Sequence, residues 1–288
     1  MLGATALWAS SPTSNKLAFR FAEVPDVIAF RICGAALVLW LAGLLLFRRN
    51  YALSRVGWRP LAMGVLEPGL VTVFIALGVA NTSAVNAAVV WSILPVTQPL
   101  LARLVLGEPV QRSVLAGAVL AVSGSALLFA LKQQEGSGTL FGDLMLLTGV
   151  MCAASNQLIA RTVATRVRDP LVTTCYQLLT ASVLALGLLA FHGGPSIGPA
   201  ALETADLAIL FLLILTTAGP FFLYNTALQH LPVGRISLFA PLSGPLGASI
   251  ASLVFDEPLG AGVIGAIALV LSGAMLPPLA GWLATRRQ

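Results

Sequence analysis

Two stretches of this chain repeat each other and decide its architecture. Residues Gly107–Leu128 read GEPVQRSVLAGAVLAVSGSALL, and residues Asp256–Leu276 read DEPLGAGVIGAIALVLSGAML. Glu108-Pro109 matches Glu257-Pro258 at an offset of 149 residues, and Ser123-Gly124 matches Ser272-Gly273 at the same offset. Both stretches lie within long apolar sequence. An internal duplication in an apolar chain is typical of transporters built from two related halves.

The composition predicts an exterior that faces lipid. Of the 288 residues, 58% are hydrophobic and 9% are charged, whereas a soluble domain carries about 25% charged residues. The 27 Gly and 17 Pro are tolerated in membrane helices, where neighbouring helices satisfy the freed backbone groups. The net charge of +5 comes from basic residues in membrane-flanking loops, so it does not indicate nucleic-acid binding.

Ten segments reach the length of about 20 mostly apolar residues that a membrane-spanning helix needs. The first basic residue is Lys16, so we expect the first span to be a retained anchor without a cleaved leader. We predict an all-α membrane protein with ten transmembrane helices, forming two five-helix halves at residues 1–135 and 136–288. The predicted spans are Leu2–Phe19, Pro25–Phe47, Leu61–Ala80, Ser83–Leu106, Val110–Leu131, Leu140–Arg161, Pro170–Phe191, Ala205–Leu228, Gly234–Phe255 and Leu259–Leu283.

The loop charges predict an orientation. If the spans alternate, one face carries Arg48, Arg49, Arg55, Arg59, Arg112, Arg161, Arg166, Arg168, Arg235, Arg286 and Arg287. The opposite face carries only Arg20 and Lys132, with most of the acidic residues. Basic loops stay in the cytoplasm, so both termini are predicted inside. Because five spans is an odd number, the second half enters the membrane inverted, with Glu108 on the cytoplasmic side and Glu257 on the outer side.

Polar and aromatic residues inside the spans predict a binding cavity between the halves, because such groups are costly in hydrocarbon. Amides and hydroxyls suit the amino and carboxylate groups of a small solute, and aromatic rings supply flat walls. The alternative is that these residues bind helices to one another or lie in the interfacial belt. The candidate substrate-binding residues are Trp8, Ser11, Asn15, Thr72, Trp91, Pro95, Gln98, Cys152, Ser155, Asn156, Tyr224, Asn225, Phe239 and Ser243.

Charged residues and prolines inside spans are candidates for a gate and for hinges. Glu67 and Arg103 are candidates for an inner gate or a neutralising pair, and Glu67 is alternatively a carrier of a coupling proton. Prolines inside spans remove helix hydrogen bonds and produce either hinges or fixed kinks. They are Pro12, Pro95, Pro99, Pro220, Pro241 and Pro245.

Catalytic and metal-binding patterns are missing from the sequence. Cys33, Cys152 and Cys175 are an odd number without metal-ligand spacing, and His192 and His230 fall on opposite predicted faces. A Walker-type phosphate loop is also absent. We therefore expect no metal, no cofactor, no enzyme activity and no ATP-driven pumping by this chain alone.

Several short motifs carry a resemblance to the drug/metabolite transporter superfamily, in its ten-helix branch with two EamA domains. In the first half they are Leu7-Trp8-Ala9-Ser10, Ile93-Leu94-Pro95-Val96, Leu106-Gly107-Glu108-Pro109 and Ala121-Val122-Ser123-Gly124. In the second half they are Tyr224-Asn225-Thr226-Ala227-Leu228, Phe239-Ala240-Pro241-Leu242, Glu257-Pro258 and Leu271-Ser272-Gly273. The resemblance covers the whole chain.

The resemblance implies a secondary transporter of the bacterial inner membrane that exports metabolites. The branch that exports amino acids, including aromatic ones, is the most similar, because Tyr224-Asn225 stands where those exporters have an aromatic-Asn pair. Cys152 departs from that branch, which carries a bulky aromatic there. The expected partners are a small-molecule substrate and the lipid bilayer, with the chain as a monomer or homodimer. Export of other metabolites or drugs and a channel remain alternatives to amino acid export by alternating access.

Overall fold

A computed structural model gives the fold and describes most of the chain. The described residues are 1–47, 56–81, 94–107, 109–131, 139–167, 169–196, 202–231, 236, 239, 242–255 and 261–285. The principal helices are α1 (Leu2–Ala18), α2 (Val24–Leu41), α4 (Arg59–Gly64), α5 (Val71–Asn81), α7 (Leu94–Leu106), α8 (Arg112–Leu131), α9 (Leu140–Arg166), α10 (Pro170–Phe191), α11 (Thr204–Leu228), α13 (Ser243–Phe255) and α14 (Ala261–Thr285). The π-helical segment η1 (Ala42–Leu46) continues α2, and the segment η2 (Val65–Leu70), which contains a non-helical residue, follows α4. The predicted all-α fold is confirmed for these residues.

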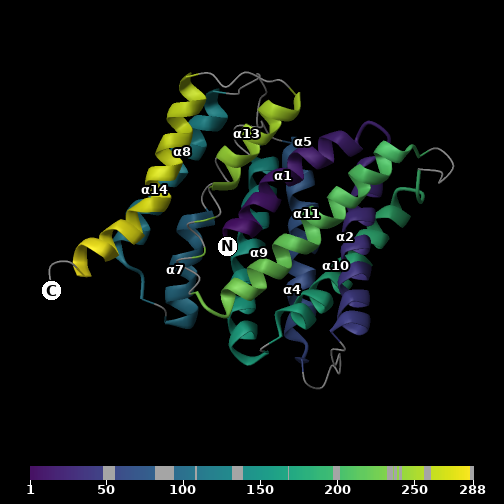
Figure 1. Ribbon diagram of the computed structural model, residues 1–288, viewed down its shortest axis with the longest axis horizontal. Helices are drawn as coiled ribbons and strands as arrows, with labels where there is room; N and C mark the ends of the chain where they lie inside the picture. Colours follow the sequence, from purple (N-terminus) through teal and green to yellow (C-terminus); the bar gives the residue numbers. More distant parts are fainter. Residues whose placement is uncertain are drawn as a thin grey trace. The chain divides into compact units, whose positions relative to one another are not determined.

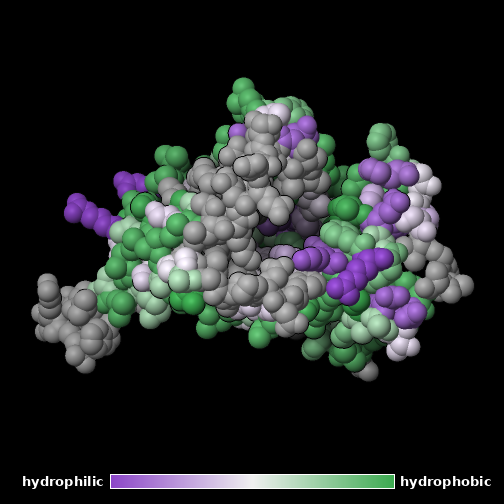
Figure 2. Space-filling view, turned by 90° about the horizontal axis from the view of Figure 1, so that it is seen from above, coloured by the Kyte–Doolittle hydropathy of each residue, from purple (hydrophilic) through white to green (hydrophobic). Residues whose placement is uncertain are grey.

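Four described helices are long and apolar enough to cross a membrane. They are Val24–Leu46, Leu140–Arg166, Pro170–Phe191 and Thr204–Leu228. Large apolar side chains also lie exposed on the helices, among them Phe191 at 88% and Leu104 at 80% exposure. Hydrophobic residues cover most of the coloured surface in Figure 2. Such a surface suits hydrocarbon better than water.

Polar side chains set the starts of α10 and α11, which match the predicted spans closely. The Asp169 carboxylate accepts hydrogen bonds from the main-chain N–H groups of Leu171 and Val172, satisfying donors that a helix start leaves unpaired. Glu203 and Asp206 form a reciprocal capping box at the start of α11. These caps explain why both helices begin where the apolar sequence begins.

The end of α9 differs from the predicted span. Hydropathy placed the end at Arg161, but the helix continues to Arg166. The hydroxyls of Thr162 and Thr165 donate hydrogen bonds to main-chain oxygens one turn earlier. These polar side chains therefore have hydrogen-bond partners within the helix itself. Arg161 itself donates through Nη1 to the main-chain oxygen of Leu228, near the end of α11.

The chain forms two compact units, and each takes helices from both sequence halves. Unit 1 comprises residues Met1–Gly69 and Ile159–His230, and unit 2 comprises Leu70–Leu158 and Leu231–Gln288. In unit 1, α1 packs on α11, and α2 packs on both α10 and α11 (Figure 1). One buried cluster joins Ala35 of α2, Leu178 of α10 and Phe221 of α11.

In unit 2 the duplicated stretches form two helices that lie side by side. Helices α8 and α14 pack along each other (Figure 1). They start at Arg112 and Ala261, whose numbers differ by 149, the offset of the sequence repeat. A separate buried cluster in this unit joins Val71 of α5, Leu94 of α7 and Val150 of α9. The two copies of the repeat therefore meet as direct neighbours.

The third predicted span is broken, which the prediction of a continuous helix over Leu61–Ala80 missed. Glu67 has φ −142° and ψ 123°, an extended conformation between α4 and α5. Pro68 follows it and has no N–H to offer the helix. Pro68 was not among the prolines predicted to lie inside spans. Its position next to Glu67 is the physical reason for the break, because proline disfavours a helical residue before it.

Helix α4 approaches α10 without side chains between them. A Cβ built on Gly64 would lie 1.8 Å from the main-chain oxygen of Gln177 and 2.0 Å from Oγ1 of Thr180. Thr180 Oγ1 also lies 2.9 Å from the main-chain oxygen of Leu61 and donates to it. Only glycine permits this contact at position 64, and the contact holds α4 against α10 within unit 1.

Candidate functional site

An aromatic group on α1 and α11 forms the first part of the site. The Trp8 ring lies edge-on to Phe221 at a centroid distance of 5.8 Å and tilted against Tyr224 at 5.6 Å. Trp8 is half-buried, whereas Tyr224 is only 5% exposed. The Tyr224 hydroxyl is buried and has no hydrogen-bond partner among the described residues. Buried hydroxyls normally have partners, so this oxygen is a candidate contact for a solute.

A hydrogen-bond chain crosses from α11 through α10 to the broken helix. Asn225 Nδ2 donates to Thr174 Oγ1 and to Gln177 Oε1, both over 2.9 Å. Gln177 Nε2 in turn donates to the main-chain oxygen of Glu67 over 2.9 Å. Asn225, a predicted substrate-binding residue, thus has both amide hydrogens engaged by protein groups. These bonds connect Asn225 through Gln177 to the extended backbone at Glu67, and its contact with a substrate stays a prediction.

A second polar group surrounds the guanidinium of Arg31 on α2. Arg31 Nη2 donates to Ser11 Oγ over 2.9 Å, and Arg31 Nη1 donates to Asn15 Oδ1 over 3.1 Å. Arg31 Nε donates to Thr217 Oγ1 of α11 over 2.9 Å. Ser11 and Asn15 lie one turn apart on α1, so they share one face of the helix. Five of the predicted substrate-binding residues therefore lie in unit 1: Trp8, Ser11, Asn15, Tyr224 and Asn225.

Other predicted site residues belong to unit 2. Gln98 of α7 is fully buried, and neither atom of its amide head has a hydrogen-bond partner among the described residues. Asn156 of α9 is 2% exposed, and Ser155 beside it is half-buried. Cys152 packs against the buried cluster around Val150. The remaining members with described side chains are half-buried: Thr72 on α5, Phe239 before α13, and Ser243 at the start of α13.

Some predicted positions lie outside the described residues. Trp91, Glu108 and Glu257 are among them, and only the backbone of Pro95 is described, within α7. Of the predicted gate pair, Glu67 belongs to unit 1, whereas Arg103 lies exposed in the last turn of α7 in unit 2. The gate formed by Glu67 and Arg103 stays a prediction.

Sequence reasoning missed three residues that organise the site. Arg31 was not among the predicted site residues, but its hydrogen bonds connect α2 to both α1 and α11. Thr174 and Gln177 lie in a span to which no polar face was assigned. The available signal was a charged or amide side chain within an apolar stretch, which marks functional positions in membranes.

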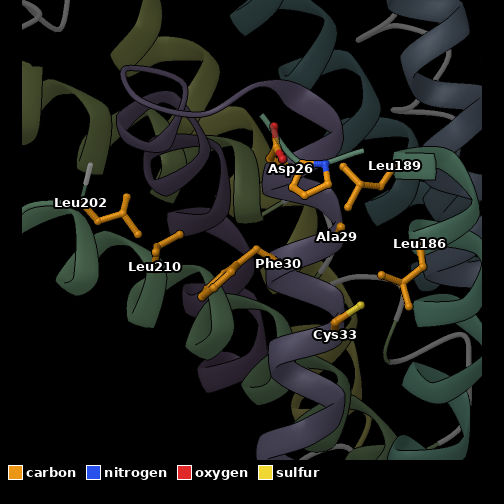
Figure 3. Close-up of a pocket in the computed structure, with 9 residues that line it drawn as sticks. Asp26, Ala29, Phe30, Cys33, Leu186, Leu189, Leu202 and Leu210 are labelled. Atoms are coloured by element: carbon orange, nitrogen blue, oxygen red, sulfur yellow. The ribbon is translucent and has the colours of Figure 1, made fainter. Parts of the chain in front are cut away.

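An apolar cavity of about 400 Å³ lies elsewhere in unit 1, near the start of α2. Figure 3 shows its walls: Phe30 and Cys33 from α2, Leu186 and Leu189 from α10, and Leu210 from α11. Asp26 at its edge accepts hydrogen bonds from the main-chain N–H and the hydroxyl of Ser196. None of the predicted substrate-binding residues lines this cavity. Phe30 and Leu186 are exposed, so the cavity opens to the surface of the protein.

The sequence profile of the EamA-like transporter family matches residues 1–130 and 140–277, nearly the whole chain. The chain belongs to the EamA-like transporter family. Membership in this family agrees with the four described helices that are long and apolar enough to cross a membrane, and together they indicate a multi-pass membrane protein. The match is to transporters and not to a catalytic family.

Two further similarities agree with this membership. The chain is 27% identical over 205 residues to "Uncharacterized transporter YyaM" of Bacillus subtilis (strain 168). That alignment covers 68% of this chain and 65% of the relative, so the EamA-like chain spans about two thirds of the relative's length. A crystal structure 17% identical in sequence superposes with a TM-score of 0.80, covering 97% of this chain and 96% of the other. The latter likeness shows a shared fold.

Proposed function

We propose that this EamA-like protein is a secondary transporter that exports amino acids, including aromatic ones, by alternating access. Export of other metabolites or drugs is the alternative within the same family. The observation that carries the proposal is the group of Trp8 on α1 with Phe221 and Tyr224 on α11, with the Tyr224 hydroxyl buried and unpartnered among the described residues. Three aromatic rings and one hydroxyl suit a solute with an apolar ring or chain and a polar end.

The broken helix supports a carrier mechanism. Transporters commonly place the substrate beside discontinuous helices whose backbone is held by neighbouring protein. Here the main-chain oxygen of Glu67, which is extended, accepts a hydrogen bond from Gln177. Gln177 in turn accepts one from Asn225, the residue that follows Tyr224 in the sequence. A helix interrupted at this point can bend without breaking a continuous hydrogen-bond ladder. In the proposed cycle, this bend closes one side of the site while the other side opens.

The inverted repeat supplies the second part of the proposal. Residues 1–135 and 136–288 are proposed as five-span halves of opposite orientation, giving ten spans with both termini in the cytoplasm. The family matches at residues 1–130 and 140–277 correspond to these halves. The packing of α8 on α14 also supports a common origin. The bacterial inner membrane is the proposed location.

The remaining predicted residues complete the proposed site. The apolar walls are assigned to Trp8, Trp91, Tyr224 and Phe239, and the solute's polar groups to Ser11, Asn15 and Asn156. Thr72, Pro95, Gln98, Cys152, Ser155 and Ser243 are proposed to line the path. Asn225 is proposed to position Gln177, because both of its amide hydrogens are engaged. Glu67 and Arg103 are proposed as the inner gate.

Counterflow in proteoliposomes tests this function. Vesicles are loaded with an unlabelled amino acid, and uptake of the labelled amino acid is followed for the wild type, Trp8→Ala and Trp58→Ala. Trp58 is 68% exposed and serves as the matched control. We expect rapid counterflow by the wild type and Trp58→Ala, and a loss of about tenfold or more in Trp8→Ala, as for a central aromatic contact. Equal rates in all three proteins would refute the assigned site.

A further inference from the structure

We infer that Arg31 forms a recognition site for the carboxylate of the transported solute, an assignment that rests on the proposed function. Arg31 is the eighth residue of α2, roughly 10 Å along the helix from its start. A charged side chain at such a position inside a membrane span is costly and marks a functional site unless a partner neutralises it. Its partners therefore decide its role.

The partners of Arg31 are neutral. Ser11, Asn15 and Thr217 each offer a side-chain oxygen, and among the residues that the structure describes no carboxylate forms an ion pair with Arg31. Hydroxyl and amide oxygens orient the guanidinium but leave its positive charge uncompensated. A site that holds a cation with neutral groups is prepared to receive an anion.

The geometry leaves donors for that anion. A guanidinium has five N–H groups, of which three donate to Ser11, Asn15 and Thr217. Each terminal nitrogen makes only one of these bonds, so each keeps one further N–H. A planar fork of this kind matches the two oxygens of a carboxylate. Arg31 is half-buried, so it is partly open to its surroundings.

The position of Arg31 also agrees with the aromatic group. Ser11 lies three residues after Trp8 on α1, and Thr217 lies two turns before Tyr224 on α11, so both helices present a ring and an Arg31 contact on the same side. An amino acid with its carboxylate at Arg31 would thus extend its side chain toward Trp8 and Tyr224.

Competition experiments in the counterflow assay test the assignment. The probes are the fastest-moving L-amino acid and its carboxamide, which differ only in the carboxylate. We expect the wild type to prefer the acid about tenfold or more, the effect of a charge-assisted hydrogen bond. Arg31→Gln is expected to lose most of this preference. Arg31→Lys keeps the positive charge but lacks the planar guanidinium, so it should retain part of the preference for the acid. Arg20→Gln, at an exposed position after α1, is the control and keeps the full preference.

A second variant keeps the test decisive if Arg31→Gln does not fold. Asn15→Asp is nearly isosteric and introduces a carboxylate next to Arg31 Nη1. We expect it to weaken competition by the acid much more than competition by the carboxamide, so that the preference for the acid is lost. A preference that survives in Arg31→Gln or in Asn15→Asp would overturn the assignment, as would a wild type that transports acid and carboxamide equally. A wild type that shows no counterflow of any amino acid would instead refute the proposed function, and this inference with it.

Discussion

The side-chain amide of Gln177 donates a 2.9 Å hydrogen bond to the main-chain oxygen of Glu67. Glu67 is extended, so its carbonyl group does not belong to a regular helical ladder. Inside a membrane an unpaired carbonyl group is costly because no water replaces the lost bond. Gln177 therefore makes the interruption of this helix tolerable, and Asn225 orients Gln177. The break and the polar side chains of α10 and α11 form one structural element.

Removal of the Gln177 donor should destabilise the protein. Gln177→Leu leaves the Glu67 oxygen without this donor, so we expect the free energy of unfolding to fall by about 1–3 kcal/mol. Gln177→Glu keeps an acceptor for Asn225 and isolates the loss of the donor. Thermal unfolding in detergent measures the effect. Ser123→Ala removes an exposed hydroxyl that bonds within its own helix and should change little; an equally stable Gln177→Leu protein would contradict the structural role.

The Gln177 and Asn225 substitutions should be coupled. Both side chains belong to one chain of hydrogen bonds, and residues in one network are not additive. We expect the double variant Gln177→Leu/Asn225→Leu to lose less stability than the two single variants together, with a coupling energy of about 0.5–3 kcal/mol. A double-mutant cycle of unfolding temperatures in detergent measures it. Simple additivity would show that Asn225 acts independently.

A larger residue at Gly64 should separate α4 from α10. A Cβ there meets the main-chain oxygen of Gln177 at 1.8 Å, which backbone movement alone can relieve. We expect Gly64→Ala to cost at least about 1–3 kcal/mol, as overpacking does. Gly187→Ala is the matched control on α10, because a Cβ there meets nothing within 4 Å and alanine favours a helix. Thermal unfolding of the two variants should move in opposite directions; a destabilised Gly187→Ala with a stable Gly64→Ala would contradict the packing.

Substitution of Tyr224 separates binding from stability. Tyr224→Phe removes a buried hydroxyl that has no partner among the described residues, so the unloaded protein should be as stable as the wild type or slightly more stable. If a solute bonds to that hydroxyl, the half-saturation concentration in counterflow should rise about three- to tenfold, equivalent to roughly 1 kcal/mol. Unchanged transport with unchanged stability would remove the hydroxyl from the site.

The sequence predicted the features that depend on single helices or on the repeat. Hydropathy located α1, α10 and α11 to within about one residue, because caps begin α10 and α11 where the apolar sequence begins. The duplicated stretches became α8 and α14, which pack together. Helical spacing also placed Ser11 and Asn15 on one face, and both contact Arg31.

The remaining features depend on how helices rotate against one another, which periodicity within one helix does not fix. The contacts of Arg31 form only where α1, α2 and α11 meet. The sequence of α2 alone does not show whether Arg31 contacts these helices or the acidic residues near it in the sequence. Gln177 is a single amide in an apolar span, and its purpose depends on the break at Glu67. That break was missed because hydropathy reads Pro68 and Gly69 as compatible with a span.

The inverted orientation of the halves is open to a labelling test. In a variant without the three native cysteines, Glu108→Cys should react with a membrane-impermeant thiol reagent only after permeabilisation, whereas Glu257→Cys should react in intact cells. Opposite sides follow from five spans in each half. Labelling of both positions from the same side would contradict the inversion.

The central claim is that the chain carries a solute through one binding site that opens to each side in turn. Initial uptake into proteoliposomes, measured against solute concentration with and without unlabelled solute on the opposite side, tests it most directly. A carrier predicts saturable uptake that the opposite-side solute accelerates. Uptake that rises linearly, ignores the opposite-side solute, or equals that of protein-free vesicles would contradict the claim.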